Sequence, residues 1–274
     1  MSQTIKSDPH LDLHSEQGAL RGEHPGRSAN PVIKVTDLAW LEFEKPDLSK
    51  AVSFARAFGL AVHARTDDAV YLRGTWQNTP CIVVRRGSTS RFLGPAFSAG
   101  DAADLQRFAD KTGRRVSATD DRIGGQSVTV RDPGGHHTLA MTLGPDPGYV
   151  HSAYQVNDLD ALAAGGEYLL ESGYKRAWGV GRHILGSQVF DYWRDPDRLM
   201  MEHFTDGDVF GNTVETGWTP MSAANLSQWG PPVTRDFLDI NPSPRLAISA
   251  IQSLRADNEL GFPLLLALMK AMNP

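Results

Sequence analysis

The fold of this 274-residue chain is decided by the stretch from Tyr149 to Asp208, which contains YVHSAYQVNDLDAL (149–162) and WGVGRHILGSQVFDYWRDPDRLMMEHFTDGD (178–208). Short strand-like runs flank a helical segment in this stretch. Three side chains in it can converge, because His151 lies on the first strand, His183 in a loop and Glu202 on the last strand. Imidazole and carboxylate groups are ligands of iron, manganese and zinc ions. The stretch therefore predicts a β-α-β-β-β unit with candidate metal ligands.

The same order of elements occurs in three copies along the chain. Each copy has an aspartate at the turn from its first strand to its helix, namely Asp47, Asp101 and Asp158. Aspartate at such a turn commonly caps the helix that follows. In the second copy, 126–132 (QSVTVRD) and 135–141 (GHHTLAM) are predicted as the last strands. We therefore predict an α+β fold of repeated β-α-β-β-β modules with mixed, curved sheets.

Only the third copy carries metal-binding residue types at both of its candidate positions. Seven residues before the turn aspartates, the copies have Trp40, Gly94 and His151. Seven residues after the aspartate of a DP turn, the second and third copies have Leu139 and Glu202. His151 and Glu202 are therefore the candidate metal ligands.

The composition excludes several classes of partner. The chain is 41% hydrophobic and 22% charged with a net charge of −5, so neither nucleic acid nor an anionic membrane surface is expected to bind it. No apolar run is long enough for a transmembrane helix. The N-terminus has no secretory apolar core, and Cys81 is the only cysteine. We therefore expect a cytoplasmic protein.

The chain divides into four predicted segments. Residues 1–30 are polar and predict a flexible N-terminal arm, and 31–145 form a diverged N-terminal paired-module region. Residues 146–210 form the C-terminal module with the metal-site motifs. Residues 211–274 predict an extension with helices, beginning with a Pro-, Gly- and Trp-rich part that lies extended over the surface. An odd number of modules leaves one sheet face unpaired, so we expect a homo-oligomer.

The repeated unit, with a histidine on one strand and a glutamate on another, resembles the vicinal oxygen chelate superfamily. That superfamily includes glyoxalases, bleomycin-resistance proteins and extradiol ring-cleaving dioxygenases. The stretches HHTLAM, VHSAYQV, GRHILGSQVFDYWRDP and MMEHFTDGD are most similar to type I extradiol dioxygenases of the dihydroxybiphenyl and catechol 2,3-cleaving group. The resemblance implies an iron(II)-dependent oxidoreductase, with manganese(II) as an alternative metal, that opens a catecholic ring with dioxygen.

The resemblance also implies a role for each candidate residue. His151 and Glu202 correspond to two metal ligands. His137 corresponds to the acid–base histidine beside the substrate, His183 to a histidine that hydrogen-bonds the substrate, and Tyr192 to the tyrosine near a catechol hydroxyl. These types suit the chemistry, since an imidazole can accept the catechol proton near neutral pH and a phenol can hold a ring oxygen.

The sequence departs from the family pattern in two ways. Most of one module is lacking, because HHTLAM follows VRDPGG directly. The histidine ligand of that module is also lacking, because no histidine lies between His63 and His136. Arg198 stands where the turn before the last strand normally has glycine, so we expect a different turn and a displaced last strand. Two alternatives stay open: a catalytically impaired or non-catalytic homologue that binds a small molecule, and a glyoxalase-type isomerase or lyase.

Overall fold

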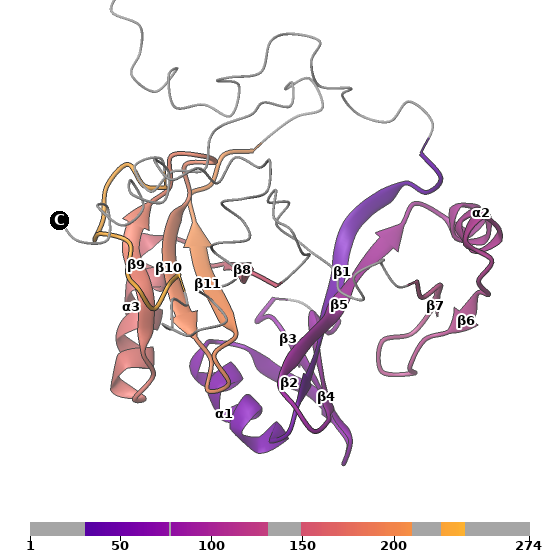
Figure 1. Ribbon diagram of the computed structural model, residues 1–274, viewed down its shortest axis with the longest axis horizontal. Coiled ribbons are helices and arrows are strands. Elements are labelled where there is room, and N and C mark those ends of the chain that lie inside the picture. Colours follow the sequence, from indigo (N-terminus) through magenta and orange to yellow (C-terminus); the bar gives the residue numbers. More distant parts are fainter. Residues whose placement is uncertain (1–30, 77, 131–148, 210–225, 239–274) are drawn as a thin grey trace, which may run out of the picture.

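The computed structural model describes residues 31–76, 78–130, 149–209 and 226–238 (Figure 1). The predicted N-terminal arm, the strand 135–141 with His137, and most of the C-terminal extension lie outside the described residues. Within the described part, no helix combines the length and the apolar character needed to cross a membrane.

The first module forms most of a five-stranded sheet. Its elements and the first strand of the second module are β1 (Val35–Lys45), α1 (Leu48–Ala57), β2 (Ala61–Arg65), β3 (Ala69–Arg73), β4 (Ile82–Arg86) and β5 (Arg91–Ala99). The strand order is β2-β3-β4-β1-β5. The sheet is mixed, because β1 pairs with β4 in parallel and all other neighbours are antiparallel.

The third module forms a four-stranded sheet with the same internal order. Its elements are β8 (Ser152–Gln155), α3 (Leu159–Glu171), β9 (Arg176–Arg182), β10 (Val189–Arg194) and β11 (Met200–Thr205). The strand order β8-β11-β10-β9 places the first strand beside the last, as in the first module, and this pair is again parallel. The predicted repeat of modules and the mixed sheets are thus confirmed for these two copies.

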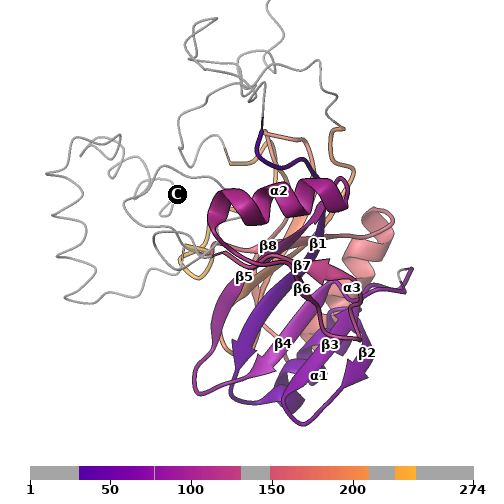
Figure 2. The ribbon, with the colours of Figure 1, turned by 90° about the vertical axis from the view of Figure 1, so that its right-hand side faces the viewer.

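The second module differs from the other two in the described residues. Its first strand β5 joins the sheet of the first module, and α2 (Ala102–Thr112) packs against it toward the end opposite α1 (Figure 2). The strands β6 (Ser117–Ala118) and β7 (Gln126–Ser127) form a separate two-stranded sheet. The strand predicted for 126–132 is therefore wrong in length, since only Gln126 and Ser127 pair among its described residues 126–130.

Each of the three turn aspartates caps its helix as predicted. The Oδ1 atom of Asp47 accepts hydrogen bonds from the amides of Ser49 and Lys50, both at 2.9 Å. Asp101 and Asp158 each accept one amide from the first turn of α2 and α3. These bonds satisfy amide groups that have no partner inside the helix.

The first and third modules share one hydrophobic core. One face of each sheet contributes to it, and α1 lies between the sheets (Figure 1). Phe43 on β1, Leu169 on α3 and Met201 on β11 are all buried in this core. The expectation that the third module can pair only across a dimer is therefore wrong. The homo-oligomer stays a prediction, without that argument to support it.

The turn before β11 corrects a second expectation. Arg198 adopts φ of 72°, the left-handed conformation that glycine normally supplies. Its amide donates to the carbonyl of Asp195 at 2.9 Å, which closes the turn. β11 pairs with β10 in continuous register from Met200 to Thr205. The expected displacement of the last strand is thus wrong, because the arginine accepts the strained conformation.

Replacement of Arg198 by glycine tests this strain. A left-handed residue other than glycine costs roughly 1–2 kcal/mol, while glycine loses about 0.5–1 kcal/mol more through chain entropy. We expect Arg198→Gly to unfold with a free energy about 1 kcal/mol higher than Arg198→Ala, as measured by urea denaturation. The two variants both lack the guanidinium bond to Asp236, so their difference isolates the backbone. Equal stabilities would contradict the prediction.

A buried ion pair between β9 and β10 gives the protein a defined pH dependence. The fully buried Asp191 lies 2.8 Å from Nε of Arg176. Burial raises the pKa of Asp191 to about 6 and outweighs the opposing effect of Arg176. The folded state therefore binds this proton more tightly than the unfolded state does. Protonation stabilises the fold at low pH, and this contribution is lost as the pH rises from about 4 to about 6.

We expect the contribution of Asp191 to amount to roughly 2–3 kcal/mol. The measurement is the free energy of unfolding in urea at pH 4 and pH 7, for the wild type and for Asp191→Asn. The variant should gain stability relative to the wild type on going to pH 7, since it cannot ionise. Parallel pH profiles of the two proteins would show that Asp191 has an ordinary pKa.

Candidate metal and substrate site

Three of the predicted site residues lie on one face of the sheet of the third module. Glu202 on β11 pairs with Ala153 on β8 and with Tyr192 on β10. Side chains alternate along a strand, so His151, two residues before Ala153, points to the same face as Glu202. His203 points to the opposite face, where its Nε2 atom lies 2.9 Å from the carbonyl oxygen of Phe58. His203 therefore makes a structural contact with the end of α1 and takes no part in the candidate site.

The two predicted metal ligands are in direct contact. Nε2 of His151 lies 3.2 Å from Oε2 of Glu202, and Nε2 of His183 lies 3.9 Å from Oε1 of the same carboxylate. Glu202 is 1% exposed, while the imidazole of His151 keeps part of its surface accessible. The edge of the His151 ring also faces Tyr192, with 5.2 Å between the ring centroids.

The hydrogen bonds of His183 define its protonation. Its Nδ1 atom lies 2.6 Å from the carbonyl oxygen of Leu226, which can only accept, so Nδ1 carries the proton. Nε2 is then the acceptor for the hydroxyl of Tyr192 at 2.8 Å. Burial lowers the pKa of His183, and burial together with the carboxylate of Glu202 raises that of Tyr192. Both groups are therefore neutral near pH 7, with a basic nitrogen and a phenolic proton side by side.

The residues present fit part of a metal centre. Oε1 of Glu202 is buried and accepts no hydrogen bond from the described residues, and Nδ1 of His151 is likewise without a partner there. A buried carboxylate oxygen without a donor is costly, and a bound cation would satisfy it. Among the described residues, however, no group of three histidine, cysteine, aspartate or glutamate side chains could hold a metal ion. The described site thus offers two protein donors.

A segment of the C-terminal extension, residues 226–238, covers this face of the sheet. The indole of Trp178 donates to the carbonyl of Pro231 at 2.9 Å, and Thr234 donates to the carbonyl of Ala177. Val233 is buried against Trp178 and its aromatic neighbours on β10. The segment lies over the sheet as predicted, but residues 235–238 form a turn and are not extended. Their contact with His183 was not predictable, because a backbone carbonyl acceptor leaves no signal in the sequence.

The corresponding positions of the first module do not form a metal site. By strand register, they carry Trp40, Val83 and Tyr71 in place of the histidine, the glutamate and the tyrosine of the third module. Only the tyrosine is retained, and its hydroxyl donates to Asp120 at 2.7 Å. His63 lies exposed on β2, the edge strand of that sheet. It is therefore a poor candidate for a third ligand.

Comparisons with known proteins agree with this arrangement. No family model matches the chain. Metapyrocatechase 2 of Cupriavidus necator is 32% identical over 139 residues, which cover 49% of this chain and 42% of that protein. The structure of homoprotocatechuate 2,3-dioxygenase from Brevibacterium fuscum, in complex with 3,4-dihydroxyphenylacetate, superposes with a TM-score of 0.63 at 16% identity. The superposed region covers 79% of this chain and 95% of the dioxygenase chain.

The chain shares the fold of this solved structure and is similar in sequence to metapyrocatechase 2 over about half of its length. It spans less than half of that relative. The fold is also shared with the Mn(II)-bound glyoxalase of Novosphingobium aromaticivorans, at a TM-score of 0.57 and 15% identity, over 72% of this chain and 91% of that one. The predicted α+β fold of repeated modules is confirmed by these matches.

Proposed function

We propose that this protein belongs to the vicinal oxygen chelate superfamily and is an iron(II)-dependent extradiol dioxygenase that opens the ring of a catecholic substrate with dioxygen. The proposal is carried by the buried Oε1 atom of Glu202, which lacks a donor in the described residues and adjoins three further candidate site residues. The similarity to metapyrocatechase supports the reaction class. Manganese(II) is the alternative metal.

His151 and Glu202 are the residues that would hold the metal ion. A bound iron(II) ion supplies the charge that favours a catecholate and the redox chemistry with dioxygen. His137, which lies outside the described residues, is proposed as the acid–base histidine. The described residues do not supply a third protein donor, so binding is expected to be weaker than at a site with three.

The described residues suit the binding of a catechol. The lone pair on Nε2 of His183, which accepts the hydrogen bond of Tyr192, can instead accept a proton from one hydroxyl of the substrate once the substrate displaces the Tyr192 hydroxyl. Tyr192 keeps its own proton because its pKa is raised, so it can donate a hydrogen bond to a ring oxygen. Trp178 and Phe190, both buried, form apolar surroundings beside the rings of Tyr192 and His183.

The test is anaerobic reconstitution of the protein with iron(II), followed by metal analysis and assays with catechol and 2,3-dihydroxybiphenyl. We expect one bound metal per chain, oxygen uptake, and a yellow ring-fission product. The variant Tyr192→Phe should keep the metal and lose about 100-fold or more in turnover, within the range for general acid–base and positioning groups. His63→Ala controls for adventitious metal binding at an exposed imidazole and should change neither value.

A second candidate function is the non-catalytic binding of a catecholic ligand. It is favoured by the two-donor site in the described residues. In that case the protein would bind the metal and the catechol, yet it would consume no oxygen. Failure to bind iron(II) or manganese(II) at all would contradict both proposals.

A further inference from the structure

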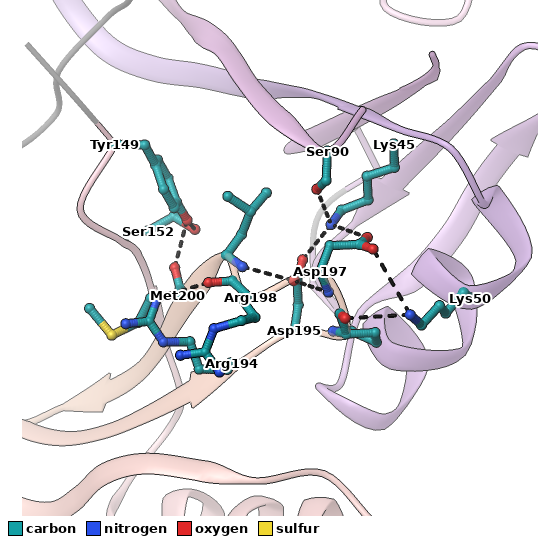
Figure 3. A network of polar contacts seen from close by, with 12 residues as sticks. Lys45, Lys50, Ser90, Tyr149, Ser152, Arg194, Asp195, Asp197, Arg198 and Met200 are labelled. Atoms are coloured by element: carbon teal, nitrogen blue, oxygen red, sulfur yellow. Dashed lines mark hydrogen bonds and ion pairs between the residues drawn. The ribbon is translucent and has the colours of Figure 1, made fainter. Parts of the chain in front are cut away.

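A buried lysine of the first module is bonded to the turn that leads to Glu202. Lys45, the last residue of β1, is 5% exposed. Its Nζ atom donates to Oδ2 of Asp195 at 2.5 Å and to Oδ2 of Asp197 at 2.9 Å (Figure 3). Ser90 lies at 3.4 Å from the same nitrogen. The contacts join residues 150 positions apart in the sequence, and they bridge the first and third modules.

The second oxygen of Asp195 organises the turn itself. Oδ1 accepts the amides of Asp197 and Leu199, both at 2.9 Å. The amide of Asp195 donates to the carbonyl of Leu199, and the carbonyl of Asp195 accepts the amide of Arg198. The carboxylate that holds Lys45 therefore makes two of the bonds that shape the turn, and the backbone of the same residue makes two more. β11 begins directly after this turn, and Glu202 is its third residue.

The start of β8 is fastened to the same region. The hydroxyl of Tyr149 donates to the carbonyl of Met200 at 2.6 Å and lies 2.9 Å from Oγ of Ser152 (Figure 3). His151 stands between Tyr149 and Ser152 in the sequence. The segments that carry both candidate ligands are thus tied together near their first residues, beside the turn that Lys45 holds.

The charge of Lys45 indicates that this contact fixes the position of the turn and does not merely hold the two modules together. Ion pairs in a protein interior gain little net stability, because desolvation offsets the attraction, and apolar side chains would join the modules equally well. A charged group held by two carboxylates does, however, fix the direction and distance of its partners. Removal of the lysine would leave Asp195, which is also buried, without its cation.

We propose that Lys45 is a positioning residue for the candidate metal site, acting through the Asp195–Leu199 turn. The first module, which carries no metal ligands at the corresponding positions, thereby determines where the carboxylate of Glu202 stands relative to His151. This inference rests on the proposed function, since it concerns the affinity of the same site for its metal.

The test compares Lys45→Met with the wild type in the full-length, metal-free protein. We expect manganese(II) to bind about 10-fold or more weakly, the range found for groups that orient metal ligands. Affinity is measured by calorimetry at a temperature where circular dichroism shows each variant to be fully folded. The electron paramagnetic resonance spectrum of bound manganese(II) should change as well, because the carboxylate takes a different position.

Two control variants test whether a loss of manganese(II) affinity could come from lower stability or from the loss of a positive charge, and not from a displaced ligand. Val52→Ala weakens the same core without touching the network, and it should leave the affinity for manganese(II) unchanged. Lys50→Met removes an exposed charge 4.0 Å from Asp197 and should change the affinity less than twofold. If Lys45→Met proves unable to fold, Asp197→Asn removes one of the two carboxylates and should give a smaller loss of affinity.

An affinity of Lys45→Met equal to that of the wild type, or lowered no more than in Val52→Ala, would overturn the proposal. The proposed function fails separately, if the wild type itself binds no metal. In that event, amide hydrogen exchange still decides whether Lys45 orders the turn. Asp197 and Leu199 should exchange faster in Lys45→Met than in Val52→Ala, and equal exchange would overturn the anchoring role.

Discussion

Glu202→Gln is expected to abolish metal binding and, at the same time, to stabilise the metal-free protein. The loss of affinity should exceed the roughly 100-fold effect of groups that only orient ligands, because a ligand itself is removed. The gain in stability arises because Glu202 is almost fully buried and one of its oxygens has no donor in the described residues. A neutral amide is less costly to bury there, and its nitrogen can donate to Nε2 of His151, now 3.2 Å from Oε2.

We expect the free energy of unfolding of the metal-free Glu202→Gln variant to rise by about 1–3 kcal/mol. Urea denaturation in the presence of a chelator measures this value, and calorimetry with manganese(II) measures the affinity. Glu167→Gln is the matched control, because Glu167 is an exposed carboxylate on α3. A variant that is less stable than the wild type and still binds manganese(II) would show that Glu202 has a structural role instead.

A gain in stability on removal of a candidate ligand would itself argue for function. Substitution of a residue that serves packing lowers the stability of the protein. Substitution of a ligand residue can raise it, because a binding site without its ligand contains unfavourable contacts. Glu202 fits the second case, since its neighbours are an imidazole and a phenol, not a lysine or an arginine. The ion pair of Asp191 and Arg176 on the other face of β10 shows that the same sheet can pair a buried carboxylate with a guanidinium.

The local part of the fold was predictable from the sequence because its signals are local. Asp47, Asp101 and Asp158 each bond to amides two or three residues away, so their capping role is visible in a short window. Strand alternation likewise separates Glu202 from His203, since neighbouring residues on a strand face opposite sides. The common face of His151 and Glu202 therefore followed from residue spacing, whereas the roles of His183 and Tyr192 came from the family resemblance.

The pairing of the modules was not predictable from the same signals. The bonds of Lys45 to the Asp195–Leu199 turn join distant parts of the chain, and a lysine at the end of a strand is ordinarily exposed. The left-handed conformation of Arg198 is also set from outside, by the surrounding bonds of the turn, against its own preference. Both features depend on which parts of the two modules pack together, and the hydrophobic periodicity of the sequence does not show this.

The covering segment 226–238 depends on two glycines, and Gly181→Ala is expected to detach it. A Cβ atom at Gly181 would lie 2.5 Å from Cζ of Phe190 and 2.8 Å from the carbonyl oxygen of Trp229. On the other side, Gly230 has φ of 130°, and its Cβ would lie 2.7 Å from Cα of Gly181. The two backbones thus approach too closely for any side chain. The bridge between Arg182 and Trp229 forms at this point.

We expect Gly181→Ala to lower the free energy of unfolding by about 3 kcal/mol, the size associated with overpacking and lost buried hydrogen bonds. The backbone of Gly181 is not left-handed, so the loss reports the close approach alone. The amide of Gln228, which donates to the carbonyl of Arg182 at 2.7 Å, should lose its protection from hydrogen exchange. Trp178 should become accessible to a fluorescence quencher, because its bond to Pro231 breaks.

Gly165→Ala supplies the matched control, since a Cβ there meets only His203 at an ordinary 3.6 Å. In a helix this substitution should be neutral or stabilising by up to about 1 kcal/mol. If Gly181→Ala proved as stable as Gly165→Ala, the covering segment would not lie on β9 in solution. If it is destabilised and exposes Trp178, the segment is what fixes the proton of His183, through the carbonyl of Leu226. The tautomer of His183 would then be set by residues outside the repeated modules.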